Sequence, residues 1–191
     1  MTSKLAGTAA LVTGASSGIG AATARQLAAL GASVALVARR RDRLEALAVE
    51  IENAGGTALA IEADITDCAQ AQAAVDRTAD IVNISSIAGR VAWNGYGVYN
   101  LTKFGVNGFT ESLRQEITQR HVRVGVLEPG GVDTELGSHN TPEVRGELID
   151  PFYEQTKVLA PEDVADAVAY MVTRPRHASI AELWIMPTDQ A

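Results

Sequence analysis

The stretch that decides the fold is Thr13-Gly14-Ala15-Ser16-Ser17-Gly18-Ile19-Gly20, in which three glycines interrupt a short polar run. Residues 8–12, before it, are apolar and too few for a helix, so they predict a buried strand. Residues 20–30, after it, are rich in alanine and leucine and end at Gly31, which predicts a helix. Glycines in such a turn let the backbone approach a phosphate closely, and the helix directs free N–H groups at it. A plain glycine turn is the alternative to a phosphate site made by Gly14, Ser16, Ser17, Gly18, Ile19 and Gly20.

The rest of the chain alternates between the same two kinds of element. Short apolar runs predict strands at 33–38, 57–61, 80–84, 121–127 and 181–185. Helices are predicted at 42–53, 66–77, 96–119 and 161–173, whereas the polar stretch 133–160 favours loops. Such alternation gives a parallel sheet with helices on both faces. We therefore expect an α/β protein, a Rossmann-type doubly wound parallel sheet in three layers (α/β/α), with residues 1–191 as a single domain.

Composition narrows the partners that the chain can have. Its 191 residues are 47% hydrophobic and 20% charged, as in globular proteins, with a net charge of −7. That charge argues against nucleic acid or an anionic membrane as the main partner. No signal peptide or membrane span is recognisable, and the single cysteine, Cys68, excludes an internal disulfide. We therefore expect a cytoplasmic protein. His121, His139 and His177 lie far apart in the sequence, so we expect no metal site.

The end of the second predicted strand indicates which nucleotide the turn would bind. Arg39, Arg40 and Arg41 stand there, with no acid before Asp42. In dinucleotide-binding units an acid at this position binds a ribose 2′-hydroxyl, and an arginine binds a 2′-phosphate. Cations at a helix start are unfavourable unless an anion joins them, and a phosphate accepts bidentate arginine bonds. The sequence favours NADP over NAD, with Arg39 and Arg40 as ligands; a solvated charged turn is the alternative.

A candidate catalytic group follows the fourth predicted strand. Tyr99 and Lys103 are four residues apart and share one face of a predicted helix. A neighbouring ammonium, together with the positive charge of oxidised nicotinamide, would lower the pKa of the phenol and suit it to acid–base catalysis. Ser86, just after the strand at 80–84, can hydrogen-bond a substrate oxygen as charge develops on it. We expect Ser86, Tyr99 and Lys103 to be catalytic; Ser85 is the alternative serine, and an exposed Tyr–Lys pair is the alternative for the helix.

Taken in order, these motifs resemble the short-chain dehydrogenase/reductase family. The matching elements are T-G-x-x-x-G-x-G, a serine thirteen residues before Y-x-x-x-K, and P-G-x-x-x-T at 129–134. The resemblance implies an NADP(H)-dependent oxidoreductase that moves a hydride between nicotinamide and the carbonyl or alcohol carbon of a small molecule. It implies that Tyr99 is the acid and base and that Lys103 also holds the ribose. Its remaining implied cofactor contacts are Asp64, Ile65, Pro129, Gly130, Val132 and Thr134.

The tract 85–105 and the ending 184–190 look closest to the clavulanate-aldehyde-reductase-like branch, which uses NADPH to reduce aldehydes or ketones. The family also implies a homo-oligomer. One departure is large: between Asp64 and Ser86 the family has two strands, an N-N-A-G turn and a helix bearing a catalytic asparagine. About 60 residues are missing here, roughly two βαβ units' worth of chain. Asn83 is too close to Ser86 to replace that asparagine.

Three explanations of this internal shortening before Ser86 stay open. In the first, the written sequence is an internally shortened version of a normal, longer enzyme. In the second, the chain carries a genuine deletion that places residues 80–84 beside the first strand. In the third explanation, the loss leaves a non-catalytic NADP(H)-binding protein, which is the alternative function. A displacement of Ser86 by one strand spacing, about 4.8 Å, would exceed the tolerance of a catalytic site.

Overall fold

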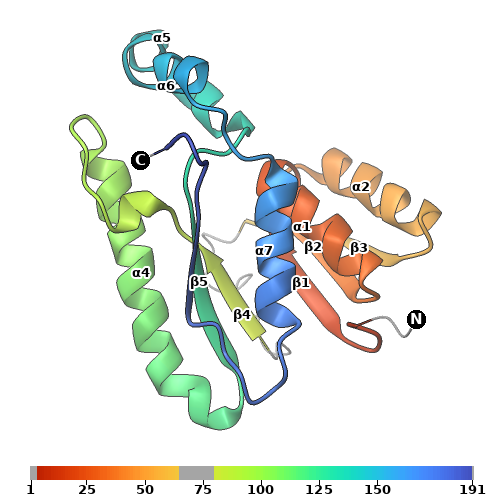
Figure 1. Ribbon diagram of the computed structural model, residues 1–191. Coiled ribbons are helices and arrows are strands. Elements are labelled where there is room, and N and C mark those ends of the chain that lie inside the picture. The colour runs from red at the N-terminus through yellow and green to blue at the C-terminus, as the bar shows by residue number, and fades with distance from the viewer. Residues whose placement is uncertain (1–3, 65–79, 191) are drawn as a thin grey trace. The chain divides into compact units, whose positions relative to one another are not determined.

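The computed structural model describes residues 4–64 and 80–190 (Figure 1). They belong to two compact units, Met1–Thr78 and Ala79–Ala191. The helix expected at 66–77 and the candidate ligand Ile65 lie outside the described residues. The single domain expected from the sequence stays a prediction.

The first unit is a parallel sheet with two helices on one face. Its strands pair in the order β1-β2-β3, and the connections are helical, as parallel pairing requires. A Cβ added at Gly56 would touch both Ile51 and Ala28, so the two helices lie together on the same side of the sheet. The elements are β1 (Ala9–Thr13), α1 (Gly18–Ala29), β2 (Ser33–Ala38), α2 (Arg41–Asn53) and β3 (Thr57–Glu62).

The second unit is a parallel sheet with helices on both faces. Its strands β4 (Asp80–Ile84), β5 (Arg123–Pro129) and β6 (Glu182–Ile185) pair in the order β4-β5-β6. Asn83 bonds Thr110 of helix α4 (Gly97–Ile117), whereas a Cβ on Gly125 would meet α7 (Pro161–Val172) at Met171. Asn83 pairs with Val126, the neighbour of Gly125, and successive residues face opposite sides of a strand. The two long helices therefore cover opposite faces of this sheet.

The strands and long helices lie within about two residues of the positions expected from the sequence, but the stretch 133–160 differs. Most of it forms short helical segments, and Figure 1 shows its α5 and α6 together. Pro142 at a first helical turn and the Thr141 hydroxyl, which accepts from Val144 N at 3.5 Å, explain why a helix starts in this polar stretch. The segments are η3 (Glu135–His139), α5 (Pro142–Val144), the π-helical turn η4 (Arg145–Ile149) and α6 (Asp150–Gln155).

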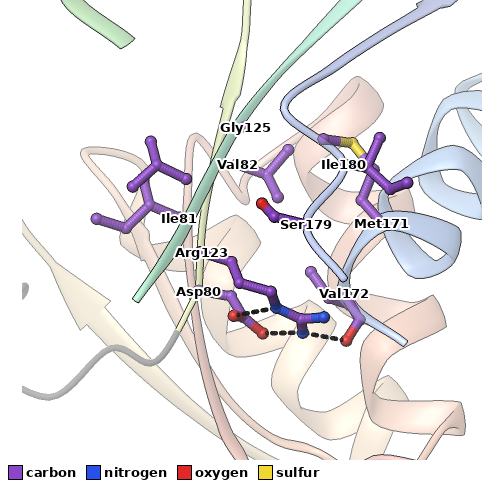
Figure 2. A pocket seen from close by; sticks show the side chains of 10 residues that line it. Asp80, Ile81, Val82, Arg123, Gly125, Met171, Val172, Ser179 and Ile180 are labelled. Atoms are coloured by element: carbon purple, nitrogen blue, oxygen red, sulfur yellow. Dashed lines mark hydrogen bonds and ion pairs between the residues drawn. The ribbon is translucent and has the colours of Figure 1, made fainter. Parts of the chain in front are cut away.

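The first residues of β4 and β5 are joined by an ion pair that closes the amino end of the second sheet. Arg123 donates to both carboxylate oxygens of Asp80, at 2.8 and 2.7 Å, and to the carbonyls of Val172, Arg174 and Ala178. Figure 2 shows this guanidinium between Asp80 and Val172. The hydrogen bonding of Arg123 to Asp80 raises the pKa of the Arg123 guanidinium. This ion pair attaches the end of α7, and the segment after it, to the sheet.

We expect Asp80→Asn to lower the free energy of unfolding by about 2 kcal/mol, because a largely buried guanidinium loses its charged partner. Urea denaturation measures the change. Asp150→Asn is the matched control, since its ion pair with Arg145 is exposed and longer, at 3.6 Å; its effect should stay below about 0.5 kcal/mol. Equal effects of the two substitutions would show that the ion pair at the amino end of the sheet adds no more to the free energy of unfolding than an exposed pair does.

Candidate functional site

The glycine turn of the first unit has the geometry of an anion cradle. Gly14 and Gly18 have φ values of 65° and 51°, which side chains other than glycine rarely adopt. A Cβ on Gly20 would collide with the carbonyl oxygen of Gly14, so the turn closes tightly against the start of α1. Ile19 is half-buried in the first turn of that helix. The N–H groups at a helix start have no partner within the helix and attract an anion.

An arginine is held directly over this cradle. Arg40 donates from Nε to the Ser16 hydroxyl at 3.1 Å and from Nη2 to the Ser17 hydroxyl at 2.7 Å. Ser17 is the N-cap of α1, with an extended backbone. The guanidinium and the helix start thus present positive charge to the same small region, although these residues are 23 and 24 positions apart in the sequence. The expected grouping of Arg40 with the glycine turn is present in the structure.

The other candidates of the first unit lie at strand ends. Arg39 is exposed directly after β2, and Arg41 begins α2, where it forms an exposed ion pair with Glu45 at 2.7 Å. Asp64 is half-buried two residues beyond β3. Ile65 falls outside the described residues. Of the arginine run, Arg40 contacts the cradle and Arg41 points its charge to a partner on its own helix.

In the second unit, the predicted tyrosine and lysine lie together at the end of β4. Lys103 Nζ donates to the carbonyls of Ile84 and Ser85, at 3.3 and 3.1 Å. It lies 5.6 Å from the centroid of the Tyr99 ring, within the range of a cation–π contact. Burial lowers the pKa of the Lys103 ammonium. The pair is therefore not the exposed helix-surface pair that the sequence left as an alternative.

Ser86 follows directly on the strand end that Lys103 contacts, and its hydroxyl reaches the last residue of β5. Its hydroxyl accepts from Ala88 N at 3.2 Å and donates to the Pro129 carbonyl at 3.5 Å. Ser85, the alternative serine, instead donates to the backbone carbonyl of Lys103 at 3.3 Å. Both serines are buried. The structure gives Ser85 a strand-end hydrogen bond and leaves Ser86 as the serine that contacts the Pro-Gly turn.

The Pro-Gly turn itself is packed under later parts of the chain. A Cβ on Gly130 would collide with Gln190 Oε1. Val132 is buried, and its carbonyl accepts from the Tyr153 hydroxyl at 2.9 Å. Thr134 caps the short helix η3 through its hydroxyl. The four family-implied contacts of this segment therefore lie on one constrained turn that begins at the carboxyl end of β5.

Aromatic side chains surround Tyr99. The ring of Tyr96 contacts those of Tyr99 and Trp93 edge to face, with centroids 6.4 and 6.1 Å apart. Burial, and then the neighbouring Tyr99, raise the pKa of Tyr96. The pKa of Tyr153 is also raised, by burial first and then by Asp133 and the two tyrosines. Helix α6 thus brings Tyr153 to the same cluster.

One residue of the site was not anticipated from the sequence. Asn100 is buried and donates from Nδ2 to the carbonyls of Ala88 and Val91, at 2.7 and 2.8 Å. It thereby attaches the loop after Ser86 to the first turn of α4. The available signal was a polar residue within the tract between the serine and the lysine, but its partners are backbone groups that no spacing rule identifies.

Within residues 4–64 and 80–190, no three histidine, cysteine, aspartate or glutamate side chains gather as metal ligands would. In the same part of the chain, no helix combines the length and the apolar character needed to cross a membrane.

Comparison with known proteins identifies the family. The family model for short chain dehydrogenase matches residues 8–80 and 76–145. Human dehydrogenase/reductase SDR family member 11 is 30% identical, over 95% of this chain and 94% of that protein. Glycine betaine reductase ATRR of Emericella nidulans is 32% identical over 97% of this chain, which spans only 19% of that protein. The chain belongs to the short-chain dehydrogenase family, whose relatives found here include named reductases and oxidoreductases.

Solved structures confirm the fold class. The closed form of serine dehydrogenase complexed with NADP+ is similar with a TM-score of 0.86 and 26% identity, covering 96% of each chain. A short chain dehydrogenase from Burkholderia cenocepacia, in complex with NADP, has a TM-score of 0.80 and 27% identity, covering 98% of this chain and 100% of that chain. The protein therefore has the Rossmann-type α/β fold expected from the sequence. The clavulanate-aldehyde-reductase-like branch stays a prediction.

The comparisons also locate the internal shortening. The family model matches in two segments that meet at residues 76–80. The alignment with the human relative extends over 246 positions, which exceeds the 191 residues of this chain by 55. The relatives therefore contain a segment that this chain lacks, as the sequence predicted.

We expect Gly20→Ala to lower the free energy of unfolding by about 1–3 kcal/mol, because its Cβ would meet backbone that cannot move aside cheaply. Gly108→Ala is the matched control: it is also a helical glycine, but its Cβ would meet nothing within 4 Å. That substitution should be neutral or stabilising by up to about 1 kcal/mol. Thermal and urea unfolding of both variants measure the difference, and a Gly20→Ala variant as stable as Gly108→Ala would contradict the close packing of the cradle.

Proposed function

We propose that this chain is an NADP(H)-dependent oxidoreductase that transfers a hydride between nicotinamide and the carbonyl or alcohol carbon of a small molecule. The observation that carries the proposal is the position of Lys103, whose ammonium contacts the Tyr99 ring and the end of β4 next to Ser86. Membership of an oxidoreductase family supports the reaction type. Two similar solved structures contain NADP or NADP+, which supports the cofactor.

The residues of the first unit fit the phosphates of NADP(H). The cradle at 14–20 would hold the pyrophosphate through the backbone N–H groups at the start of α1. Glycine at position 20 lets that helix start pack against the Gly14 carbonyl, because a Cβ there would collide with it. Arg40, with Ser16 and Ser17, would hold the 2′-phosphate, and the exposed Arg39 lies beside it in the sequence. Asp64 would contact the adenine ring, as the family resemblance implies, and Ile65 is a further cofactor contact that it implies. The bound cofactor supplies the hydride.

The residues of the second unit would provide the proton and orient the substrate. Tyr99 donates a proton to the carbonyl oxygen during reduction and accepts it during oxidation. Lys103 stabilises the phenolate form by its charge and binds the ribose hydroxyls. The Ser86 hydroxyl holds the same substrate oxygen as negative charge develops. Pro129, Gly130, Val132 and Thr134 orient the nicotinamide and so select the face of the ring that reacts.

The substrate class that we propose is a small carbonyl compound or alcohol. Sulfoacetaldehyde reductase of Chromohalobacter salexigens, 30% identical over 94% of both chains, is named for an aldehyde substrate. The contacting rings of Trp93 and Tyr96 offer an aromatic surface beside Tyr99. Assembly as a homo-oligomer and a cytoplasmic location, which the sequence suggested, stay predictions.

We expect Tyr99→Phe to reduce kcat for NADPH oxidation by at least about 1,000-fold, because the proton donor is lost. Propanal, benzaldehyde and acetophenone serve as probe substrates, and NADPH absorbance reports turnover. Tyr170→Phe is the matched control, since Tyr170 is an exposed tyrosine on α7 that contacts Arg174; it should keep full activity. NADPH binding, followed by fluorescence, should be nearly unchanged in both.

An unchanged kcat in Tyr99→Phe would refute the catalytic assignment. The shortening before Ser86 gives a specific reason to weigh a non-catalytic NADP(H)-binding protein, since the family segment with the catalytic asparagine has no counterpart here. NADPH binding by the unsubstituted chain, with no turnover of any probe, would favour that alternative.

We expect Arg40→Gln, alone and with Arg39→Gln, to raise KM for NADPH by about 10–100-fold and to change KM for NADH by less than about 2-fold. Loss of a charge-assisted bond to a phosphate that NADH lacks is the physical reason. Steady-state kinetics with each cofactor measures the change, and Arg114→Gln, on an exposed part of α4, is the control. Equal effects on NADPH and NADH would remove the 2′-phosphate assignment.

A further inference from the structure

A buried carboxylate lies directly beside the predicted catalytic residues of the second unit. Glu128 precedes Pro129 in β5, and its side chain is 0% exposed. Arg90 donates to its two oxygens at 2.7 and 3.4 Å, and Asn107 Nδ2 donates to Oε1 at 2.5 Å. The hydrogen bond that Arg90 donates to Glu128 raises the pKa of the Arg90 guanidinium. A carboxylate removed from water is costly unless such bonds replace its hydration.

The bonds of Glu128 connect four parts of the second unit. The same Asn107 Nδ2 donates to the Gly89 carbonyl at 3.0 Å, and Arg90 forms a second ion pair with Glu182 of β6 at 2.6 Å. Arg90 follows directly on η1 (Ile87–Gly89), and Asn107 lies on α4. One carboxylate thus joins β5 to the turn after β4, to α4 and, through Arg90, to β6.

Three of the four joined parts, the turn after β4, helix α4 and strand β5, carry residues of the proposed catalytic or cofactor-binding machinery. The turn is the one that Ser86 begins, because Ser86 is the N-cap of η1. Asn107 lies one helical turn beyond Lys103, on the same face of α4. Pro129, adjacent to Glu128, accepts the Ser86 hydroxyl. A shift at Glu128 would therefore displace the serine relative to the tyrosine–lysine helix, and an error of about 1 Å in a reactive arrangement can cost about 100-fold in rate.

We propose that Glu128 is a positioning residue, which holds the Ser86 turn against the Tyr99–Lys103 helix through Arg90 and Asn107. The proposal rests on the proposed function for its effect on catalysis, but the positioning itself is a property of the fold. Glu128 does not contact the reacting atoms; it fixes the backbone from which Ser86 projects. Its carboxylate suits this role because two oxygens accept from partners on separate elements at once.

The test compares Glu128→Gln with Asp80→Asn in the full chain bound to NADPH. Both substitutions remove a carboxylate charge from an ion pair with an arginine. Glu128 pairs with Arg90 near the carboxyl ends of β4 and β5, whereas Asp80 pairs with Arg123 at their amino ends. We expect Glu128→Gln to lower kcat for benzaldehyde by about 10–100-fold, with KM for NADPH within about 2-fold. Asp80→Asn, although destabilised, should keep kcat within about 2-fold. A comparable kcat in the Glu128→Gln and unsubstituted proteins, or an equal loss in Asp80→Asn, would overturn the proposal.

A second measurement does not depend on turnover. Amide hydrogen exchange reports the Ala88 and Gly89 N–H groups, which donate to the hydroxyl and carbonyl of Ser86. We expect both to exchange at least about 10-fold faster in Glu128→Gln and at an unchanged rate in Asp80→Asn, because only the first substitution loosens this turn. Unchanged exchange in Glu128→Gln would overturn the proposal.

The two measurements separate this proposal from the proposed function. Faster exchange in a chain whose unsubstituted form turns over no probe would support positioning by Glu128 and count against the enzyme. If Glu128→Gln does not fold, Arg90→Lys replaces it, since lysine keeps the charge but loses the bidentate bond. The same loss of kcat or protection at Ala88 and Gly89 is then expected, and an unaffected Arg90→Lys variant would overturn the role of the ion pair.

Discussion

The contact between the Lys103 ammonium and two carbonyls at the end of β4 is the interaction on which the candidate site depends. A partly buried ammonium must replace its lost hydration, and the carbonyls of Ile84 and Ser85 do so where the strand has ended. These two hydrogen bonds hold Lys103, and with it this turn of α4, at the carboxyl end of β4. Because Tyr99 is one helical turn earlier, fixing Lys103 also fixes the phenol near the serine turn. The chemistry of the site thus begins as a solvation requirement of one side chain.

In the first unit, the glycine turn and Arg40 together form the candidate anion site. Its cradle needs glycine for backbone reasons at three positions, and each reason can be seen in a φ value or a blocked Cβ. The guanidinium of Arg40 would be unfavourable near a helix start by itself. The serine hydroxyls accept its N–H groups, which partly offsets that cost and keeps the cation in place. The glycine turn therefore supplies a backbone geometry that suits a phosphate, and Arg40 supplies a positive charge beside it.

How much could be predicted from the sequence depended on how local the cause was. The strands 33–38 and 80–84 were predicted to the residue because apolar runs bounded by turn residues specify them directly. The tyrosine–lysine pair and the cradle were predicted because their spacing along one element determines their geometry. The short helices between 133 and 160 were missed, since their polar composition hides a helix start at Thr141 and Pro142. The bonds of Glu128 and Asn100 join residues that only the folded chain brings together, so no periodicity reveals them.

The shortening before residue 80 bears differently on the two units. The bonds described for Ser86, Tyr99, Lys103 and Glu128 all arise within the second unit, from elements that follow the point where the two family matches meet. These bonds therefore form in this chain without the missing segment. What the shortening removes is the catalytic asparagine that the family resemblance implies. A chain that keeps the phenol, the ammonium and the serine in a bonded framework retains the groups that we propose to act on the substrate oxygen. If the proposed function holds, the loss expected from the shortening is the contribution of that asparagine, because the bonds that hold the serine and the lysine form without it.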